Sequence, residues 1–84
     1  MRPRIGPGFR LQWEPAQDAH VLLYPEGMVK LNPSAAQILL RCDGERSVEA
    51  IVAELERAFN AAGLEPEVRS FIEIAQKQRW VVAE

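Results

Sequence analysis

The chain has 84 residues, 48% of them hydrophobic and 26% charged, which is typical of one small globular domain over residues 1–84. A single cysteine excludes an internal disulfide, and no signal-peptide pattern or membrane-spanning apolar run is present, so we expect a soluble, cytoplasmic protein without a membrane partner. The net charge of −2 divides into +2 for residues 1–42 and −4 for residues 43–84, and this acidic, predicted helical half counts against a nucleic-acid partner.

The first fourteen residues predict an arm followed by a strand. Residues 1–8 contain two prolines and two glycines and show no periodicity, which is typical of an extended or mobile arm. A frayed terminus is the simpler interpretation, and an arm that reaches a second subunit is the alternative. From residue 9 to residue 14 apolar and polar residues alternate, which predicts a half-buried strand with Phe9, Leu11 and Trp13 facing the core.

The centre of the chain predicts a hairpin of two short strands. Val21–Tyr24 and Met28–Leu31 are runs of apolar and β-favouring residues. Between them, Pro25 has the φ angle that starts a tight turn, and Gly27 is expected to take the positive φ that brings the chain back.

A capped helix follows the hairpin without a linker. Asn32 is the expected N-cap, and Pro33 suits the first helical position. Gly44 suits a left-handed residue at the end of this helix. Apolar residues recur between them at helical spacing: Ala35, Ile38, Leu39 and Cys42.

The second half predicts two amphipathic helices and an apolar tail. Ser47 is the expected N-cap of the first, and Pro66 fits the first turn of the second. The buried stripe of the first helix is expected to hold Val48, Ile51, Val52, Leu55 and Phe59. The buried stripe of the second is expected to hold Val68, Phe71, Ile72 and Ala75. Residues 80–82 should pack back onto the body, and three strands followed by three helices predict an α+β fold with a small antiparallel sheet.

No catalytic constellation is visible in the sequence. A glycine-rich phosphate loop, a paired-cysteine motif and an HExxH motif are all missing. His20 is the only histidine and has no candidate partner for catalysis or metal binding. Cys42 falls on an apolar helix stripe, which favours a small core residue. We therefore expect no catalytic residue, no metal ligand and no enzyme activity in this chain.

One string of residues is more specific than any single motif. It consists of Tyr24, Pro25, Glu26, Gly27, Leu31, Asn32, Pro33, Ser34, Ala35, Ala36, Ile38, Leu39, Asp43 and Gly44. This string resembles the signature of the PqqD family, and the likeness extends from Pro3 and Phe9-Arg10 to Trp80. The chain departs from the family where Lys77-Gln78-Arg79 precedes Trp80, because a glycine is expected just before that tryptophan.

The resemblance implies a fold and a function. Members of the PqqD family are winged-helix-like recognition domains for ribosomally made, modified peptides. They bind the precursor peptide PqqA and present it to the radical S-adenosylmethionine enzyme PqqE, which crosslinks a Glu and a Tyr of the peptide. The iron–sulfur cluster and S-adenosylmethionine belong to that enzyme, so no cofactor is expected on this chain.

An edge of the predicted sheet is the candidate binding site. An unpaired edge strand presents main-chain groups to which an incoming peptide can add as a further strand. We expect the peptide to bind along the second hairpin strand, with its side chains against the last helix. The expected site residues are Met28, Val29, Lys30, Leu31, Phe71, Ile74, Ala75 and Gln78.

Other interpretations of the edge and of the fold remain open. A helix or a second subunit could cover the same edge, and a homodimer is possible. Two alternative functions are considered. One is DNA binding by a winged-helix protein, and the other is a quinone-binding protein or small enzyme of the same pathway.

Overall fold

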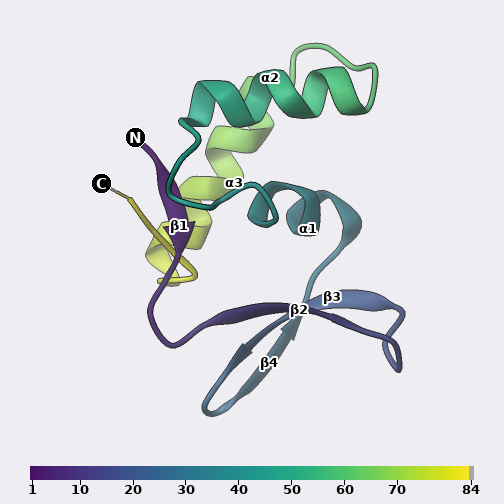
Figure 1. Ribbon diagram of the computed structural model, residues 1–84, viewed down its shortest axis with the longest axis vertical. Coiled ribbons are helices and arrows are strands. Elements are labelled where there is room, and N and C mark those ends of the chain that lie inside the picture. The colour runs from purple at the N-terminus through teal and green to yellow at the C-terminus, as the bar shows by residue number, and fades with distance from the viewer. Residues whose placement is uncertain (84) are drawn as a thin grey trace.

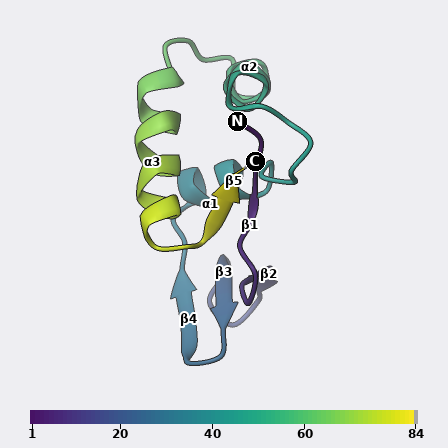
Figure 2. The same cartoon turned by 90° about the vertical axis from the view of Figure 1, so that its left-hand side faces the viewer.

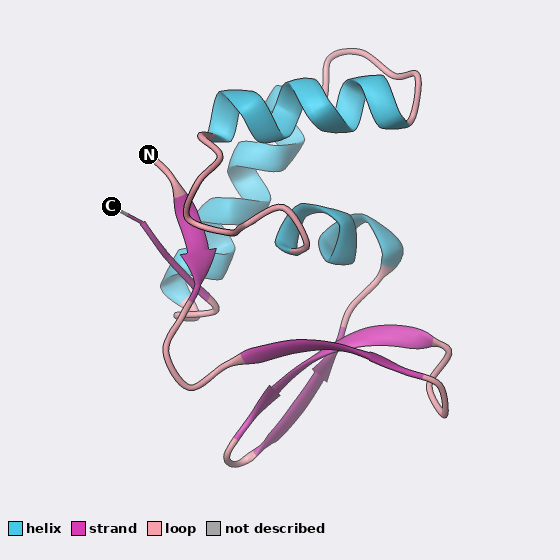
Figure 3. Cartoon of the chain, viewed as in Figure 1, coloured by secondary structure: helices cyan, strands magenta, loops and turns pink. Residues whose placement is uncertain are grey.

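The computed structural model describes residues 1–83, and over that range the chain forms five strands and three helices (Figure 1). In chain order they are β1 (Pro3–Ile5), β2 (Arg10–Glu14), β3 (Ala19–Tyr24), β4 (Gly27–Lys30), α1 (Pro33–Leu39), α2 (Val48–Ala58), α3 (Glu65–Lys77) and β5 (Val81–Ala83). An antiparallel sheet of order β2-β3-β4 lies at one end of the molecule, and the helices lie at the other (Figures 1 and 3). The predicted α+β fold, with a three-stranded sheet and three helices, is confirmed.

The register of this sheet directs one apolar row toward the helices. Leu11 pairs with Leu22 and Leu22 with Val29, and paired residues project from the same face of a sheet. Leu22 is completely buried, and Leu11 and Val29 pack partly buried against the core. Trp13 was also expected in the core, but 49% of its surface is exposed. That prediction is wrong because Trp13 lies near the end of β2, beside a β2–β3 turn that extends beyond the helices (Figure 1).

The β3–β4 hairpin turns without a left-handed residue. Tyr24 pairs with Gly27, so Pro25 and Glu26 form the two-residue turn. Gly27 is the first residue of β4 and does not have a positive φ angle, which corrects the role expected for it. Proline at the first central position of a turn allows closure with ordinary negative φ angles, so no glycine is required there.

Helix α1 begins as the sequence predicts and ends earlier. The Ala35 amide donates a 2.8 Å hydrogen bond to Oδ1 of Asn32, and Pro33 occupies the first turn. The helix ends at Leu39, so Gly44 does not terminate it. Gly44 does have a left-handed φ of 81°, and its amide donates a 2.9 Å hydrogen bond to the Pro3 carbonyl. Its role is therefore to let the loop after α1 pass close to β1.

The N-terminal segment is a strand and not a free arm. β1 pairs antiparallel with β5, with Ile5 opposite Val81, and the Gly6 amide donates a 2.8 Å hydrogen bond to the Trp80 carbonyl. A Cβ atom at Gly6 would overlap the Arg79 carbonyl, so the two segments approach too closely for any side chain there. The predicted arm is wrong for residues 3–6, because a partner at the other end of the chain orders them.

Helices α2 and α3 close the core above the sheet, as Figure 2 shows from the side. The Ala50 amide donates to Oγ of the N-cap Ser47 at 3.1 Å, and Pro66 lies in the first turn of α3, as predicted. Phe59 was expected on the buried stripe of α2, but it is 54% exposed. It is the C-cap residue, with a φ of −109° outside helical values, so its side chain leaves the stripe. The residues buried on these two helices are Val48, Ile51, Val52, Leu55, Val68, Ile72 and Ala75.

The end of α3 shows why a glycine is expected before Trp80. The Trp80 amide donates to the Ala75 carbonyl at 2.9 Å, and the Arg79 amide donates to the Gln76 carbonyl at 3.0 Å. This pair of bonds is the Schellman motif, in which the residue after the C-cap is left-handed and usually glycine. Arg79 has a φ of 65° at this position, so an arginine adopts the conformation that a glycine would favour.

Candidate functional site

The outer edge of β4 is open. Among residues 1–83, β4 has a strand neighbour only on its β3 side. The Leu31 amide donates a 3.0 Å hydrogen bond to the His20 carbonyl. Because antiparallel ladders alternate, Val29 also bonds toward β3, while the main-chain groups of Met28 and Lys30 point outward. An incoming strand would therefore find two donors and two acceptors on this edge.

The side chains of β4 differ between its two faces. Met28 and Lys30 are exposed on the outer face, and the Lys30 ammonium has no ion pair with any residue that the structure describes. Val29 is half-buried on the inner face, and Leu31 beyond it belongs to the core. Of the four residues predicted here, Leu31 has its amide bonded to β3 and its side chain in the core, so it offers a ligand almost no surface.

Helix α3 contributes a second surface on the same side of the molecule as β4 (Figure 2). Ile74 is 51% exposed and Gln78 is exposed, whereas Phe71 is half-buried with its ring 6.5 Å from that of Trp80. Ala75 is completely buried in the core, so its side chain is not available to a ligand. The exposed part of the predicted α3 site is therefore Ile74 with Gln78.

The residues of the family string build the scaffold of this edge. Tyr24 packs against Phe9 with ring centroids 5.7 Å apart, and Asn32 caps α1. Asp43 accepts hydrogen bonds from the amides of Glu45 and Arg46 at 2.9 and 3.1 Å, and these bonds lower the pKa of its carboxyl. These three residues therefore make structural contacts: Tyr24 within the sheet, Asn32 at the start of α1, and Asp43 in the loop after α1.

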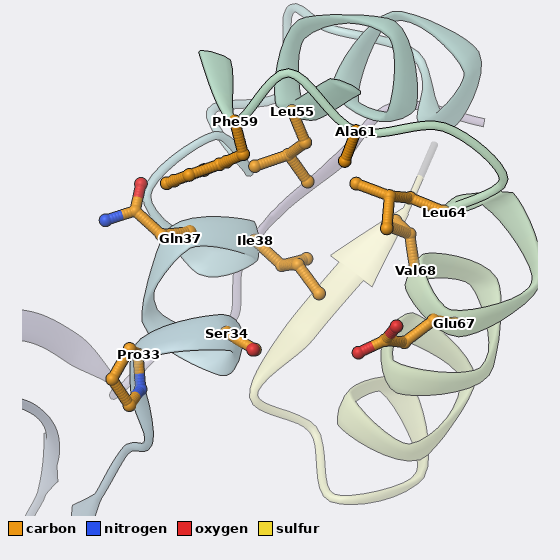
Figure 4. Close-up of a pocket in the computed structure, with 10 residues that line it drawn as sticks. All are labelled: Pro33, Ser34, Gln37, Ile38, Leu55, Phe59, Ala61, Leu64, Glu67 and Val68. Atoms are coloured by element: carbon orange, nitrogen blue, oxygen red, sulfur yellow. The ribbon is translucent and has the colours of Figure 1, made fainter. Parts of the chain in front are cut away.

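A pocket that the sequence did not predict lies between α1, the end of α2 and the start of α3 (Figure 4). Its volume is about 320 Å³, and it is lined by Pro33, Ser34, Gln37, Ile38, Leu55, Phe59, Ala61, Leu64, Glu67 and Val68. The exposed position of Phe59 creates one wall of it. Sequence periodicity placed that ring in the core. Because of this incorrect burial prediction, nothing in the sequence indicated the pocket.

The histidine and the cysteine of the described residues both pack against other parts of the protein. The ring of His20 packs edge-on against Trp13 with centroids 5.2 Å apart. Cys42 is buried, and burial raises the pKa of its thiol to about 12, so the reactive thiolate is disfavoured. Within residues 1–83 no group of three or more His, Cys, Asp or Glu side chains is placed to hold a metal ion. None of the described helices is long and apolar enough to cross a membrane.

This α+β domain, in which a hairpin leads into a capped helix and one sheet edge is open, has the architecture of a winged-helix-like domain. An open edge of this kind can accept a peptide as a further strand. Comparison with known proteins identifies the family. Residues 19–81 match the model of the family described as coenzyme PQQ synthesis protein D (PqqD). The chain belongs to the PqqD family.

Relatives and a solved structure agree with this assignment. A PqqA binding protein of Azotobacter vinelandii is 56% identical over 80 residues, covering 94% of this chain and 87% of that protein. The PqqA binding protein of Methylococcus capsulatus is 48% identical, covering 92% and 83%. The solution structure of the PqqD part of Methylobacterium extorquens PqqCD, a stand-alone recognition element for ribosomally synthesized and modified peptides, is 27% identical. It superimposes with a TM-score of 0.78 over 95% of this chain and 87% of that one. The fold is that of this recognition element.

Proposed function

We propose that this protein binds the precursor peptide PqqA in pyrroloquinoline quinone biosynthesis by adding a segment of the peptide to the edge of β4. The similar proteins named PqqA binding protein support the identity of the ligand. The open outer edge of β4 is the observation that supports the mode of binding, because exposed edges are where peptides join sheets.

The geometry of the edge defines the expected contacts. The peptide main chain bonds to Met28 and Lys30, whose amide and carbonyl groups point away from β3. Peptide side chains on the inner face lie near Val29 and extend toward Ile74 and Gln78 of α3. Lys30 pairs with an acidic peptide side chain, which adds only about 0–1 kcal/mol because the pair is exposed.

Binding in one register also prepares the peptide for modification. We infer that the chain presents PqqA to the radical S-adenosylmethionine enzyme PqqE and carries no cofactor of its own. An extended, ordered peptide loses less conformational entropy when it enters the enzyme than a free one does. The check is the yield of crosslinked PqqA made by PqqE with and without this protein; an equal yield in both reactions contradicts the presentation role.

Hydrogen exchange of individual amides tests strand addition directly. In the free protein the amides of Met28 and Lys30 should exchange rapidly, while those of Val29 and Leu31 are already protected by β3. Saturating PqqA should slow exchange at Met28 and Lys30 by at least tenfold and change Val29 and Leu31 much less. Binding without protection at Met28 and Lys30 would show that the peptide docks elsewhere.

A further inference from the structure

The pocket between α1, α2 and α3 has an apolar floor and is open to solvent. Its floor is made of the buried residues Ile38, Leu55 and Val68, and its rim includes the half-exposed Phe59 (Figure 4). Its volume of about 320 Å³ is at the small end of the range of about 300–1,000 Å³ found for ligand pockets. The size suits one or two apolar side chains of a peptide.

The pocket and the proposed peptide site share one face of α3. Glu67, Phe71, Ile74 and Gln78 recur at i, i+4, i+7 and i+11, so they share one face of α3. Glu67 lines the pocket near the start of α3, and Ile74 lies two helical turns further along the same face. From Glu67 to Ile74 is about 10 Å along a helix at 1.5 Å per residue, a distance that about three extended residues cover.

Its wall at the sheet end carries a negative charge. Pro33, which follows β4 after only two residues, lines the pocket with Ser34, and the carboxylate of Glu67 reaches toward Ser34 from α3 (Figure 4). Glu67 is exposed, and its side chain has no hydrogen bond or ion pair within the described part of the chain. An occupant with a positive charge next to its apolar side chain would complement this wall.

We propose that this pocket anchors an apolar side chain of the same precursor peptide, adjacent to a Lys or Arg that faces Glu67. The anchor lies about three to four residues from the peptide residue that contacts Ile74, given an extended rise of about 3.3 Å per residue. The peptide is thus held at two points: by main-chain bonds at β4 and by a side chain in the pocket. The proposal rests on the proposed function, because it needs PqqA to be bound along α3.

Two neighbouring alanines provide a matched test. Ala61 lines the pocket and Ala62 does not, and both are exposed in the linker between α2 and α3. Ala61→Phe should fill the pocket and weaken PqqA binding about tenfold in calorimetric titration, because burial of one apolar side chain is lost. Ala62→Phe adds the same ring outside the pocket and should stay within about twofold of the unmodified protein.

The peptide side of the contact gives the second readout. Replacing each apolar residue of PqqA by alanine should reveal one whose loss weakens binding to the unmodified protein and not to Ala61→Phe. Equal affinities of Ala61→Phe and Ala62→Phe, or the absence of such coupling, would overturn the pocket proposal. Amide protection at Met28 and Lys30, measured on the same samples, shows independently whether the β4 site stands.

A second pair of variants covers the case in which Ala61→Phe does not fold. Phe59→Ala removes one wall of the pocket and should also weaken PqqA binding, whereas Leu40→Ala removes a comparably exposed side chain that does not line the pocket. If Ala61→Phe instead abolishes self-association in sedimentation and leaves PqqA affinity unchanged, the occupant is a second copy of the chain and the proposal is wrong.

Discussion

Strands β1 and β4 are both short, yet only one of them has an open edge. β1 pairs with β5 on one side, and on its other side Arg4 bridges to Asp43 and the Pro3 carbonyl accepts the Gly44 amide. β4 pairs with β3 alone within residues 1–83. An exposed strand edge can pair with another chain. The covered edge of β1 cannot do so, whereas the outer edge of β4 can. β1 holds the ends of the chain together, and β4 is available to a ligand.

Glycine replacements in the two regions should give the largest contrast. Gly6→Ala places a Cβ onto the Arg79 carbonyl between β1 and β5, and overpacking of this kind costs about 1–3 kcal/mol of unfolding free energy. Gly27→Ala, at the start of β4, adds a Cβ in ordinary contact with the Tyr24 hydroxyl at 3.7 Å and should change stability by less than about 0.5 kcal/mol. Urea unfolding measures both, and equal losses would contradict the structural description of the β1–β5 sheet.

Proline replacements along β4 should separate binding from stability. Met28→Pro removes an outward amide and should weaken PqqA binding about tenfold, the value of one hydrogen bond of roughly 1–1.5 kcal/mol. Val29→Pro removes an amide that bonds to β3 and should lower the thermal midpoint more than Met28→Pro does. Calorimetric titration and thermal unfolding of both variants are the measurements. Unchanged PqqA affinity of Met28→Pro would argue against the β4 edge.

The turn that leads into β5 offers a stabilising change. Arg79 has a left-handed φ of 65°, and such a conformation costs an L-residue roughly 1–2 kcal/mol relative to glycine. Arg79→Gly should therefore raise the unfolding free energy by about 1 kcal/mol, reduced by the extra entropy of glycine in the unfolded chain. PqqA affinity should not change, since Arg79 is outside the proposed contacts. A loss of stability in Arg79→Gly would show that the arginine side chain contributes more than its backbone costs.

The contribution of Asp43, in the loop beside β1, to the unfolding free energy should depend weakly on pH. The amides of Glu45 and Arg46 lower the pKa of Asp43 below its ordinary 3.8. A carboxyl with a lowered folded-state pKa stabilises the fold above its unfolded pKa, and that contribution disappears as the pH falls through the folded pKa. The stability difference between the unmodified protein and Asp43→Asn should therefore be present at pH 7 and shrink below about pH 4. A difference that is independent of pH would exclude the charge of Asp43 as its cause.

Local sequence signals predicted the elements that depend on near neighbours. Asn32 and Ser47 cap their helices as expected, because a cap depends only on residues two or three positions ahead. The three-stranded sheet was likewise predicted, since its turns are short and its strands are consecutive. As predicted, β4 lies at an edge of that sheet; its role in binding remains a proposal.

Three errors share a physical cause. Trp13 and Phe59 were assigned to the core from periodicity, but Trp13 is the next-to-last residue of β2, Phe59 is the C-cap of α2, and about half of each is exposed. Residues 1–8 were expected to form an arm because they contain two prolines and two glycines without periodicity, and the three-residue strand β1 is too short to produce one. Periodicity shows which face of an element is apolar, but it does not show how far the packing partner extends.

The sequence by itself determined the hairpin, the caps of α1 and α2 and most of the buried faces of the helices, because each depends on residues a few positions apart. Only the tertiary structure decided that Pro3 meets Ala83, and that Ile38, Phe59 and Val68 surround one pocket. These contacts join residues far apart in the chain, whose approach depends on how all the elements pack and not on any local pattern.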